Sequence, residues 1–216
     1  PKMFDALCEA GESLKTNPDV RCVVLSGEGR AFCAGLDVSA MGQSGGSGSV
    51  KTEDKDDGLG RLERRTYGLT NGPQHAAWVW HELPKPVIAA VHGVAFGGGF
   101  QVALGADIRI AAPGTRFSVM EMKWGLVPDM SGMALLRNLV RDDVARELTY
   151  TARIFDTEEA DKLGLVTKVS DTPYEDAMEM ARYIAGRNPD AITAAKRLLN
   201  NVPDQTAAEI LLEESR

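Results

Sequence analysis

Two glycine-containing turns carry the strongest chemical signal in this sequence. One is Ala31-Phe-Cys-Ala-Gly-Leu-Asp37, the other is Ala95-Phe-Gly-Gly-Gly-Phe-Gln101, and each follows an apolar run typical of a strand. Glycine lets the main chain turn sharply and lets a ligand approach its N–H groups closely. If the turns face each other, they can direct two amide N–H groups at one oxygen, which is how enzymes stabilise an oxyanion. The pair therefore predicts catalysis through a negatively charged oxygen.

The elements that position these turns alternate between strand-like and helical patterns. Short strands are predicted over residues 21–26, 87–91, 107–111, 116–118 and 165–169. Helices are predicted over residues 2–15, 61–82, 100–105, 132–140, 142–151, 157–163, 173–187 and 190–200. The helix over 61–82 should be interrupted or bent near Asn71-Gly72-Pro73, because proline removes a backbone donor. This alternation favours a mostly parallel α/β core followed by a helical C-terminal portion.

Residues 42–60 are rich in Gly, Ser, Lys and Asp and have no apolar periodicity, which predicts a mobile loop. Such a stretch is either an exposed linker or, if it borders the site, a segment that orders when ligand binds.

The composition limits the classes of function. The chain has 216 residues, enough for one core with a small appendage, and its net charge of −7 argues against a nucleic-acid partner. The three cysteines form no C-x-x-C pair and there are only three histidines, so no metal site is expected. No apolar run reaches membrane-spanning length and no signal peptide opens the chain, so we expect a cytoplasmic protein without a membrane partner.

The sequence resembles the crotonase (enoyl-CoA hydratase/isomerase) superfamily over nearly its whole length. Besides the two glycine turns, the resemblance rests on three further segments: Lys85-Pro-Val-Ile-Ala-Ala-Val-His-Gly93, Ala106-Asp-Ile-Arg-Ile-Ala111 and Ala160-Asp-Lys-Leu-Gly-Leu-Val166. It implies an α/β fold, a spiral of repeated ββα units, over residues 1–150. A helical trimerisation region over 151–216 would give a homotrimer or a dimer of trimers. Relatives carry more residues at both ends, so the chain looks trimmed.

The resemblance also implies how a substrate would be held. The substrate would be a coenzyme A thioester, with no separate cofactor. The oxyanion hole of the enzyme would take one N–H from Leu36 and one from Gly98, beside the positive end of the helix that follows Gly99. Coenzyme A would lie against the first turn, near Ala34 and Asp37. Arg30 would reach its phosphates, although an ordinary surface arginine is the alternative.

An enolate in such a site needs an acid or base near the carbons beside the carbonyl. Hydratases of the family use two glutamates: one position matches Glu121, and the other holds Gln101. A neutral amide cannot act as a base, but it can bind a water or a substrate group. Glu121 lies among Met120, Met122 and Trp124, and an apolar pocket raises the pKa of a carboxyl. Glu121 is either this acid/base or a solvated acid on a turn.

Asp129 is the second candidate acid/base. It lies eight residues after Glu121, where typical hydratases have glycine. The pair is similar to that of dienoyl-CoA isomerases, which carry an aspartate in place of Gln101. Asp129 also matches the nucleophile of 4-chlorobenzoyl-CoA dehalogenases, but those enzymes have tryptophan at the position of Glu121. The alternative to catalysis is an N-cap of the helix expected from Met130.

Other reactive side chains near these motifs have structural explanations. His92 follows a strand and is expected to bond to the backbone. Cys33 is expected to pack inside the first turn rather than act as a nucleophile. Trp78, Trp80 and Trp124 could line an acyl pocket or pack in the core.

Double-bond isomerisation of an enoyl- or dienoyl-CoA, with Glu121 and Asp129 as acid/base groups, is the favoured interpretation. The nearest rival is hydration of an enoyl-CoA by Glu121, with a water held by Gln101. A non-catalytic acyl-CoA binder and thioester hydrolysis or dehalogenation through Asp129 are the remaining alternatives.

Overall fold

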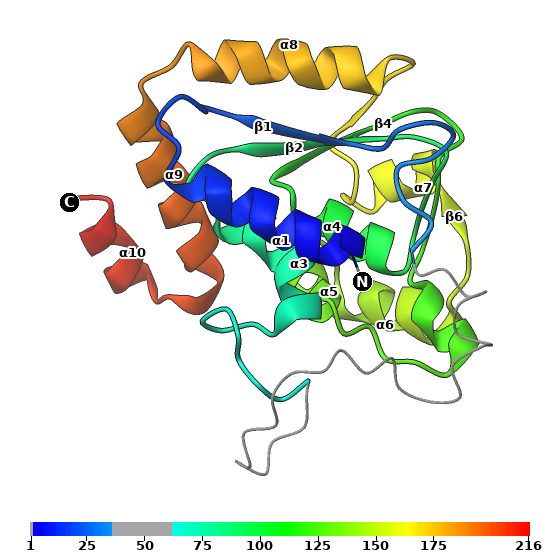
Figure 1. Cartoon of the computed structure of the whole chain (residues 1–216). Coiled ribbons are helices and arrows are strands. Elements are labelled where there is room, and N and C mark those ends of the chain that lie inside the picture. The colour runs from blue at the N-terminus through cyan, green and yellow to red at the C-terminus, as the bar shows by residue number, and fades with distance from the viewer. Residues whose placement is uncertain (1, 36–61) are drawn as a thin grey trace.

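The computed structural model describes residues 2–35 and 62–216, which form two sheets enclosed by helices (Figure 1). The first sheet has the strand order β1-β2-β4-β7, and all its pairings are parallel. Its strands are β1 (Val23–Ser26), β2 (Val87–Val91), β4 (Ile108–Ala111) and β7 (Lys168–Val169). In the second sheet, β5 pairs in parallel with β3 and antiparallel with β6. These strands are β3 (Val94–Phe96), β5 (Arg116–Ser118) and β6 (Phe155–Asp156).

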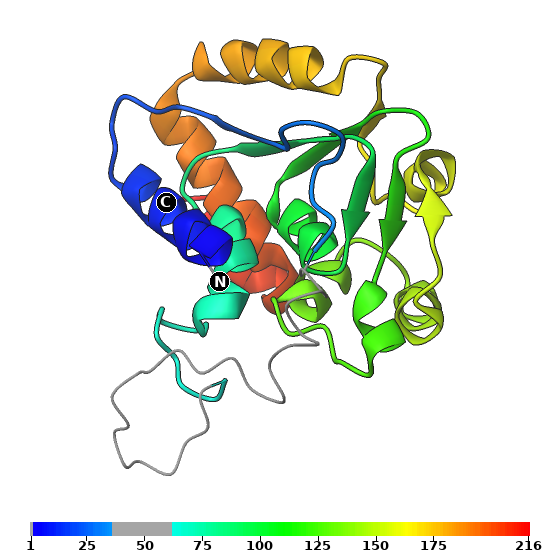
Figure 2. The same ribbon diagram turned by 45° about the vertical axis from the view of Figure 1, so that its right-hand side comes forward.

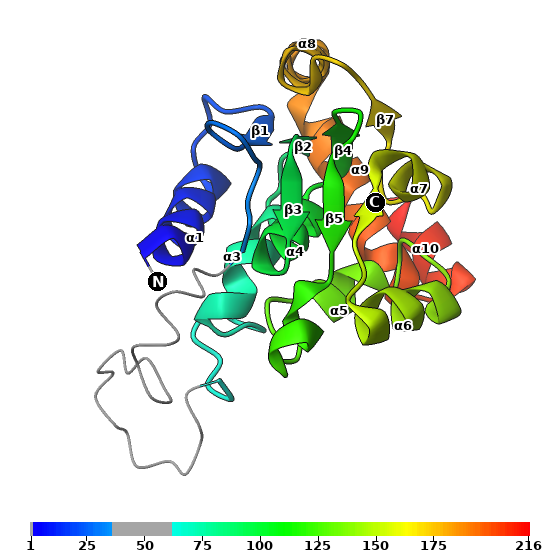
Figure 3. The same ribbon diagram turned by 90° about the vertical axis from the view of Figure 1, so that its right-hand side faces the viewer.

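Successive turns of the chain give one strand to each sheet. β2 runs into β3 and then into helix α4 (Gly98–Gly105), and β4 is followed in the same way by β5. A parallel bridge between Cys33 and Ala95 places the first glycine turn beside β3. The strands of the second sheet run across those of the first (Figure 2), and Figure 3 shows β3 and β5 side by side. The expected α/β spiral of ββα units is therefore confirmed.

Eleven helical elements, counting two short 3-10 helices, enclose the sheets in the described part of the chain. They are α1 (Lys2–Lys15), α3 (Gly72–Glu82), α4, η1 (Met120–Trp124), α5 (Gly132–Leu136), α6 (Asp142–Thr151), α7 (Thr157–Lys162), α8 (Pro173–Ala185), α9 (Pro189–Asn201) and α10 (Ala207–Glu213), with a short turn η2 (Val202–Asp204) between the last two. Helix α8 lies across one face of the first sheet, and α1 packs on α3 (Figure 1). Among the described helices, none has the length and apolar character needed to cross a membrane.

Strand β2 shows how the sheet divides the core. All five of its residues are buried. Val87, Ala89 and Val91 point into the main core with α3 and α4, whereas Ile88 and Ala90 pack against α8. Alternate side chains of a strand point to opposite faces, so a strand covered on both faces reads as a continuous apolar run. This strand carries the chain into the second glycine turn.

The helix predicted over residues 61–82 is wrong in its first half. Helix α3 begins only at Gly72, and Asn71 caps it: its side chain accepts a hydrogen bond from the Gln74 N–H, and the Gln74 side chain accepts one from the Asn71 N–H. Pro73 lies in the first turn, where its missing N–H has no helical partner to lose. The Asn-Gly-Pro run therefore starts a helix instead of bending one.

Other boundaries also differ from those expected. Helix α5 ends at Leu136 instead of Val140, and only Lys168–Val169 of the last predicted strand pairs. Strands β3 and β6 were not predicted, because two or three residues are too few for a period-2 pattern. Two strands that follow residue 150 join the sheets: β6 pairs with β5 and β7 with β4. The loop expected over 42–60 lies outside the described residues.

Candidate active site

The two glycine turns meet backbone to backbone. The Phe96 N–H donates to the Cys33 carbonyl at 3.0 Å, and Gly35 has a φ of +86°. A Cβ on Gly35 would lie 2.7 Å from the Phe96 oxygen and 3.6 Å from the Gly98 nitrogen, and one on Gly99 would lie 2.3 Å from the Cys33 oxygen. Both turns need glycine because the other turn fills the space a side chain would take.

The Gly98 N–H is in the first turn of α4, where helical N–H groups have no partner within the helix. The neighbouring Gly97 N–H donates to the Ser118 carbonyl and the Gln101 N–H to the Gly97 carbonyl. No acceptor for the Gly98 N–H is found among the described residues. The side chain of Met130 packs here, with its sulfur 2.8 Å from where a Cβ on Gly98 would lie. Leu36 and Asp37, the other expected contributors from the first turn, lie outside the described residues.

Glu121 is buried beside the second glycine turn, with only 9% of its surface exposed. Its Oε1 accepts a hydrogen bond of 2.6 Å from Gln101 Nε2 and lies 3.2 Å from where a Cβ on Gly97 would be. Its Oε2 is buried and has no hydrogen-bond partner among the described residues. Burial raises the pKa of Glu121 above its ordinary value, and the nearby charge of Asp129 adds to the effect. The geometry is that of a carboxyl with one oxygen held and one available.

Gln101 is 2% exposed and nearly saturated by protein groups. Its Oε1 accepts from the N–H groups of Met130 and Gly132, both at 2.9 Å, and its Nε2 donates to Glu121. One N–H of its amide remains. Gln101 was expected to bind substrate or water, but three of its four hydrogen-bonding positions are taken up within the protein.

Asp129 is exposed and does not cap a helix. The helix expected from Met130 begins at Gly132, after Ser131 in a left-handed conformation with a φ of +67°. Asp129 lies on a cavity of about 340 Å³ between the start of α3 and the segment before α5. The cavity is lined by apolar Leu69, Trp78, Pro128, Met133 and Ala134 and by polar Arg65, Thr70, Gln74, Asp129 and Ser131.

The other expected site residues are distributed more widely. Arg30 and Ala34 are exposed beside the first turn. Trp124 ends η1 with 56% of its surface exposed and is not among the described residues that line the cavity, whereas Trp78 is. Trp80 is a core residue whose Nε1 donates to the Ala76 carbonyl.

His92 and Cys33 have structural contacts, as expected. The Nε2 of His92 lies 3.0 Å from the Gly29 carbonyl oxygen. Cys33 is partly buried, and its Cβ lies 2.6 Å from where a Cβ on Gly99 would be.

Ser131 and Gly132 were not predicted to belong to the site. A Cβ on Gly132 would lie 2.6 Å from the Gln101 Oε1, so the amide fills the space a side chain would take. The only signal was the Ser-Gly pair itself, which is typical of turns but does not reveal its partner.

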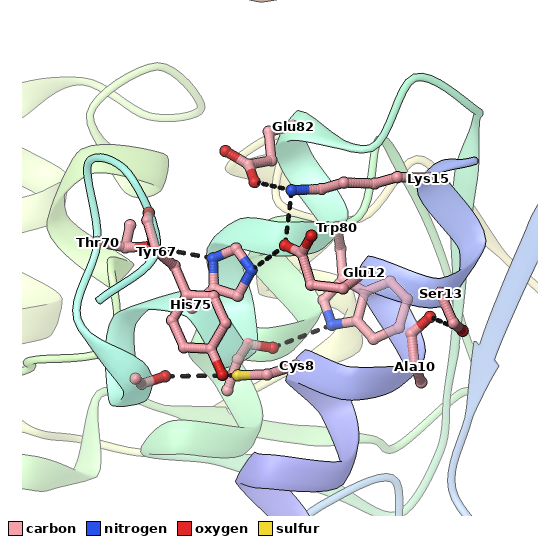
Figure 4. A network of polar contacts seen from close by, with 12 residues as sticks. Cys8, Ala10, Glu12, Ser13, Lys15, Tyr67, Thr70, His75, Trp80 and Glu82 are labelled. Carbon is pink, nitrogen blue, oxygen red and sulfur yellow. Dashed lines mark hydrogen bonds and ion pairs between the residues drawn. The ribbon is translucent and has the colours of Figure 1, made fainter. Parts of the chain in front are cut away.

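A second polar cluster joins α1 to α3 (Figure 4). The imidazole of His75 lies between Glu12 Oε1 at 2.6 Å and Thr70 Oγ1 at 3.0 Å, and the ring of Tyr67 stacks on it. Glu12, His75 and Glu82 have the spacing of metal ligands, but the Lys15 ammonium bonds to both carboxylates and supplies the cation between them. The cluster interlocks two helices.

Comparison with known proteins agrees with the spiral fold. The pattern of the family described as enoyl-CoA hydratase/isomerase matches residues 1–216. The chain is 34% identical to the peroxisomal Δ(3,5)-Δ(2,4)-dienoyl-CoA isomerase of Arabidopsis thaliana, covering 88% of this chain and 68% of that protein. It is also 34% identical to the carnitinyl-CoA dehydratase of Salmonella arizonae, covering 94% of this chain and 72% of that protein.

Solved structures of similar fold are named as enoyl-CoA hydratases. That of the Bacillus anthracis enzyme superposes with a TM-score of 0.82 at 28% identity, covering 98% of this chain and 77% of its own. The putative enzyme of Streptomyces coelicolor A3(2) gives a TM-score of 0.82 at 29% identity, covering 98% and 74%. The chain therefore belongs to the enoyl-CoA hydratase/isomerase family, and it is an enzyme with the crotonase fold.

Proposed function

We propose that this enzyme moves a double bond along the acyl chain of an enoyl- or dienoyl-CoA. Glu121 is the principal acid/base and Asp129 its partner. The observation that carries the proposal is the buried Glu121 carboxyl, with Oε1 held by Gln101 and Oε2 unbonded within the described part of the chain. A base of raised pKa suits proton transfer to and from carbon near neutral pH.

The reaction needs one proton removed and one delivered. A carboxylate takes a proton from the carbon next to the thioester carbonyl, or from the carbon conjugated to it through the double bond. The electron pair then moves onto the thioester oxygen, which gives an enolate. The N–H groups of Leu36 and Gly98 hold that oxygen, and losing one such donor costs about 2.7–4 kcal/mol of barrier. Return of the proton to a different carbon, from Glu121 or Asp129, completes the shift with no net gain or loss of atoms.

One comparison and one feature of the site support the isomerase interpretation. The Arabidopsis relative is named a dienoyl-CoA isomerase and is 34% identical. The charge of Asp129 also raises the pKa of Glu121, and Asp129 is the second carboxyl group that the proposal uses.

The test is a panel of CoA thioesters containing trans-2-enoyl, 3-enoyl and 3,5-dienoyl acyl groups. The reactions are run in H₂O and in D₂O, and the products are separated by chromatography and weighed by mass spectrometry. We expect positional isomers that carry solvent deuterium. Glu121→Gln should lower kcat by about 10²–10⁴. Asp129→Asn should lower it less if Glu121 serves both steps.

Other outcomes would overturn the proposal. Formation of 3-hydroxyacyl-CoA that survives in Glu121→Gln would remove Glu121 from the acid/base role. Binding of every thioester without turnover would favour a non-catalytic acyl-CoA binder. A covalent acyl or aryl adduct on Asp129, seen by mass spectrometry, would instead favour thioester hydrolysis or dehalogenation.

A hydro-lyase reaction is the second candidate. It is favoured by the 34% identity to a carnitinyl-CoA dehydratase over 208 residues. Glu121 would then transfer a proton to or from water, but Gln101 has only one N–H left to hold that water. Hydration of the trans-2-enoyl thioester that depends on Glu121 would favour this candidate.

We further propose that coenzyme A lies along the first turn, with Arg30 at its phosphates and Ala34 and Asp37 beside it. The exposed side chain of Arg30 leaves it accessible to a phosphate. Arg30→Gln should raise KM for acyl-CoA more than it lowers kcat. The control is the same measurement with the pantetheine thioester, which lacks the nucleotide and should not respond.

The assembly is proposed to be a homotrimer, or a dimer of trimers, formed through the C-terminal helices. Leu199, Leu211 and Leu212 are more than half exposed on α9 and α10. Apolar side chains clustered on a surface mark contact sites for other chains. Light scattering coupled to size-exclusion chromatography measures the mass directly, and a monomer at all concentrations would contradict the proposal.

A further inference from the structure

We infer that Gln101 is a positioning residue. It confines the exchangeable proton of Glu121 to Oε2, and it ties the segment that carries Asp129 to the Glu121 carboxyl. The inference deepens the proposed function and rests on Glu121 being the acid/base. It differs from the water-binding or substrate-binding role expected from the sequence.

The hydrogen bonds fix the orientation of the Gln101 amide. The N–H groups of Met130 and Gly132 both point at one atom, at 2.9 Å each, so that atom must be the carbonyl oxygen. The NH₂ group therefore faces Glu121 Oε1, at 2.6 Å. With the amide 2% exposed, solvent offers no replacement for these bonds.

The segment before α5 is shaped around this amide. Ser131 has a φ of +67°, a left-handed conformation that non-glycine residues rarely adopt. The N–H groups on either side of Ser131, those of Met130 and Gly132, both donate to a single oxygen. A Cβ on Gly132 would lie 2.6 Å from that oxygen, so residue 132 must be small. Asp129 precedes Met130 directly, so the bonds to Gln101 also hold its place.

An amide differs from a carboxyl in one decisive way. The Gln101 NH₂ can donate to Glu121 Oε1 whether Glu121 is ionised or protonated, because Oε1 is an acceptor in both states. The exchangeable proton is then confined to Oε2, the oxygen without a partner among the described residues. A glutamate at position 101 would instead face Glu121 with a second carboxyl, and the two would titrate as a coupled pair.

The main test compares Gln101→Glu with the wild type in two measurements. The first is the pH dependence of kcat/KM. Its acid limb should move to higher pH by about one unit or more, because two close carboxyl groups raise the pKa of one of them. The second is infrared difference spectroscopy against Glu121→Gln, which follows the Glu121 carboxyl without any substrate. The wild type should show one protonation step and Gln101→Glu two.

Two further variants keep the test decisive. Gly132→Ala leaves Gln101 in place but puts a methyl group against its amide, so the Glu121 titration should shift in the same direction by a smaller amount. It also covers the case in which Gln101→Glu does not fold, as judged by circular dichroism. Gln205→Glu adds the same charge on the linker between α9 and α10, and it should leave both measurements unchanged.

A single-step titration of unchanged midpoint in both Gln101→Glu and Gly132→Ala would overturn the inference. Failure of the proposed function looks different: wild type without isomerase activity, or Glu121→Gln with full activity. In that case the infrared titration still tests the link between Gln101 and Glu121.

Discussion

The two polar networks of this protein, one around the buried His75 and one around the buried Glu121, are built from similar groups but are completed differently. In the helix cluster, both ring nitrogens of His75 have partners, and Glu12 is bonded by both His75 and Lys15. In the site, Glu121 Oε1 is bonded by Gln101, but Oε2 has no partner among the described residues. The first network contains its own cation, and the second has an acidic neighbour in Asp129.

This difference separates a structural network from a reactive one. A buried polar group without a partner costs about 1–3 kcal/mol, and a bound substrate group that completes the hydrogen bond recovers that cost. The helix cluster has no such group, and its hydrogen bonds stabilise the packing of α1 on α3. The Glu121 network keeps one acceptor open beside the turn expected to hold a thioester oxygen.

The largest expected effect is on the reaction. Glu121→Gln retains an acceptor for the Gln101 NH₂ and nearly the same volume, so folding should be preserved while kcat falls by about 10²–10⁴. Steady-state kinetics and chemical denaturation of the same preparation measure the two quantities. A variant that loses stability and keeps its kcat would reverse the assignment of the two networks.

The next effect is on stability and falls in the helix cluster. His75→Leu removes the partner of Glu12 and Thr70 and the ring on which Tyr67 stacks, which should lower the free energy of unfolding by about 2–3 kcal/mol. The kcat of the folded protein should stay within about twofold, since His75 is not expected to touch the reacting atoms. A much larger loss of kcat would mean that this cluster is part of the site.

The pH dependence of stability should have opposite signs in the two networks. Burial raises the pKa of Glu121, so its contribution is present at low pH and is lost as pH rises through its folded value. Hydrogen bonding to Lys15, then to His75, lowers the pKa of Glu12, so its contribution is present above the ordinary carboxyl range and is lost on acidification. Relative to wild type, Glu121→Gln should therefore gain stability as pH rises, and Glu12→Gln should lose it.

Urea denaturation of these two variants across the acidic and neutral range measures both trends. Parallel curves for Glu121→Gln and wild type would mean that Glu121 titrates in the folded protein as it does in the unfolded chain.

The smallest effect is expected at Lys15. Its ammonium and both of its carboxylate partners are between a quarter and a half exposed. Lys15→Met should therefore cost about 0.5–1 kcal/mol, decreasing as salt is added. A cost of several kcal/mol that does not respond to salt would show that the ammonium acts as a buried charge.

Local patterns predicted the parts of the fold that depend on local forces. The helix over residues 2–15 and strand β2 agree with expectation, because apolar periodicity and a continuous apolar run reflect burial directly. A break was expected near Asn71 within one long helix, but the residues before it are not helical; an Asn-Gly-Pro run looks the same in sequence at a helix break and at a helix start. The two glycine turns were recognised as a pair, and their contact is confirmed by the packing of Gly35 and Gly99.

By itself, the sequence determined the family, the order of most of the longer strands and helices, and the carboxyl groups available for chemistry. Only the tertiary structure decided how those groups are paired. Gln101 reaches Glu121 across 20 positions and Gly132 across 31, and nothing in either local pattern encodes that contact. Hydrogen bonds between distant segments depend on how the sheets and helices pack, and that packing turned an expected water-binding amide into the support of an acid/base.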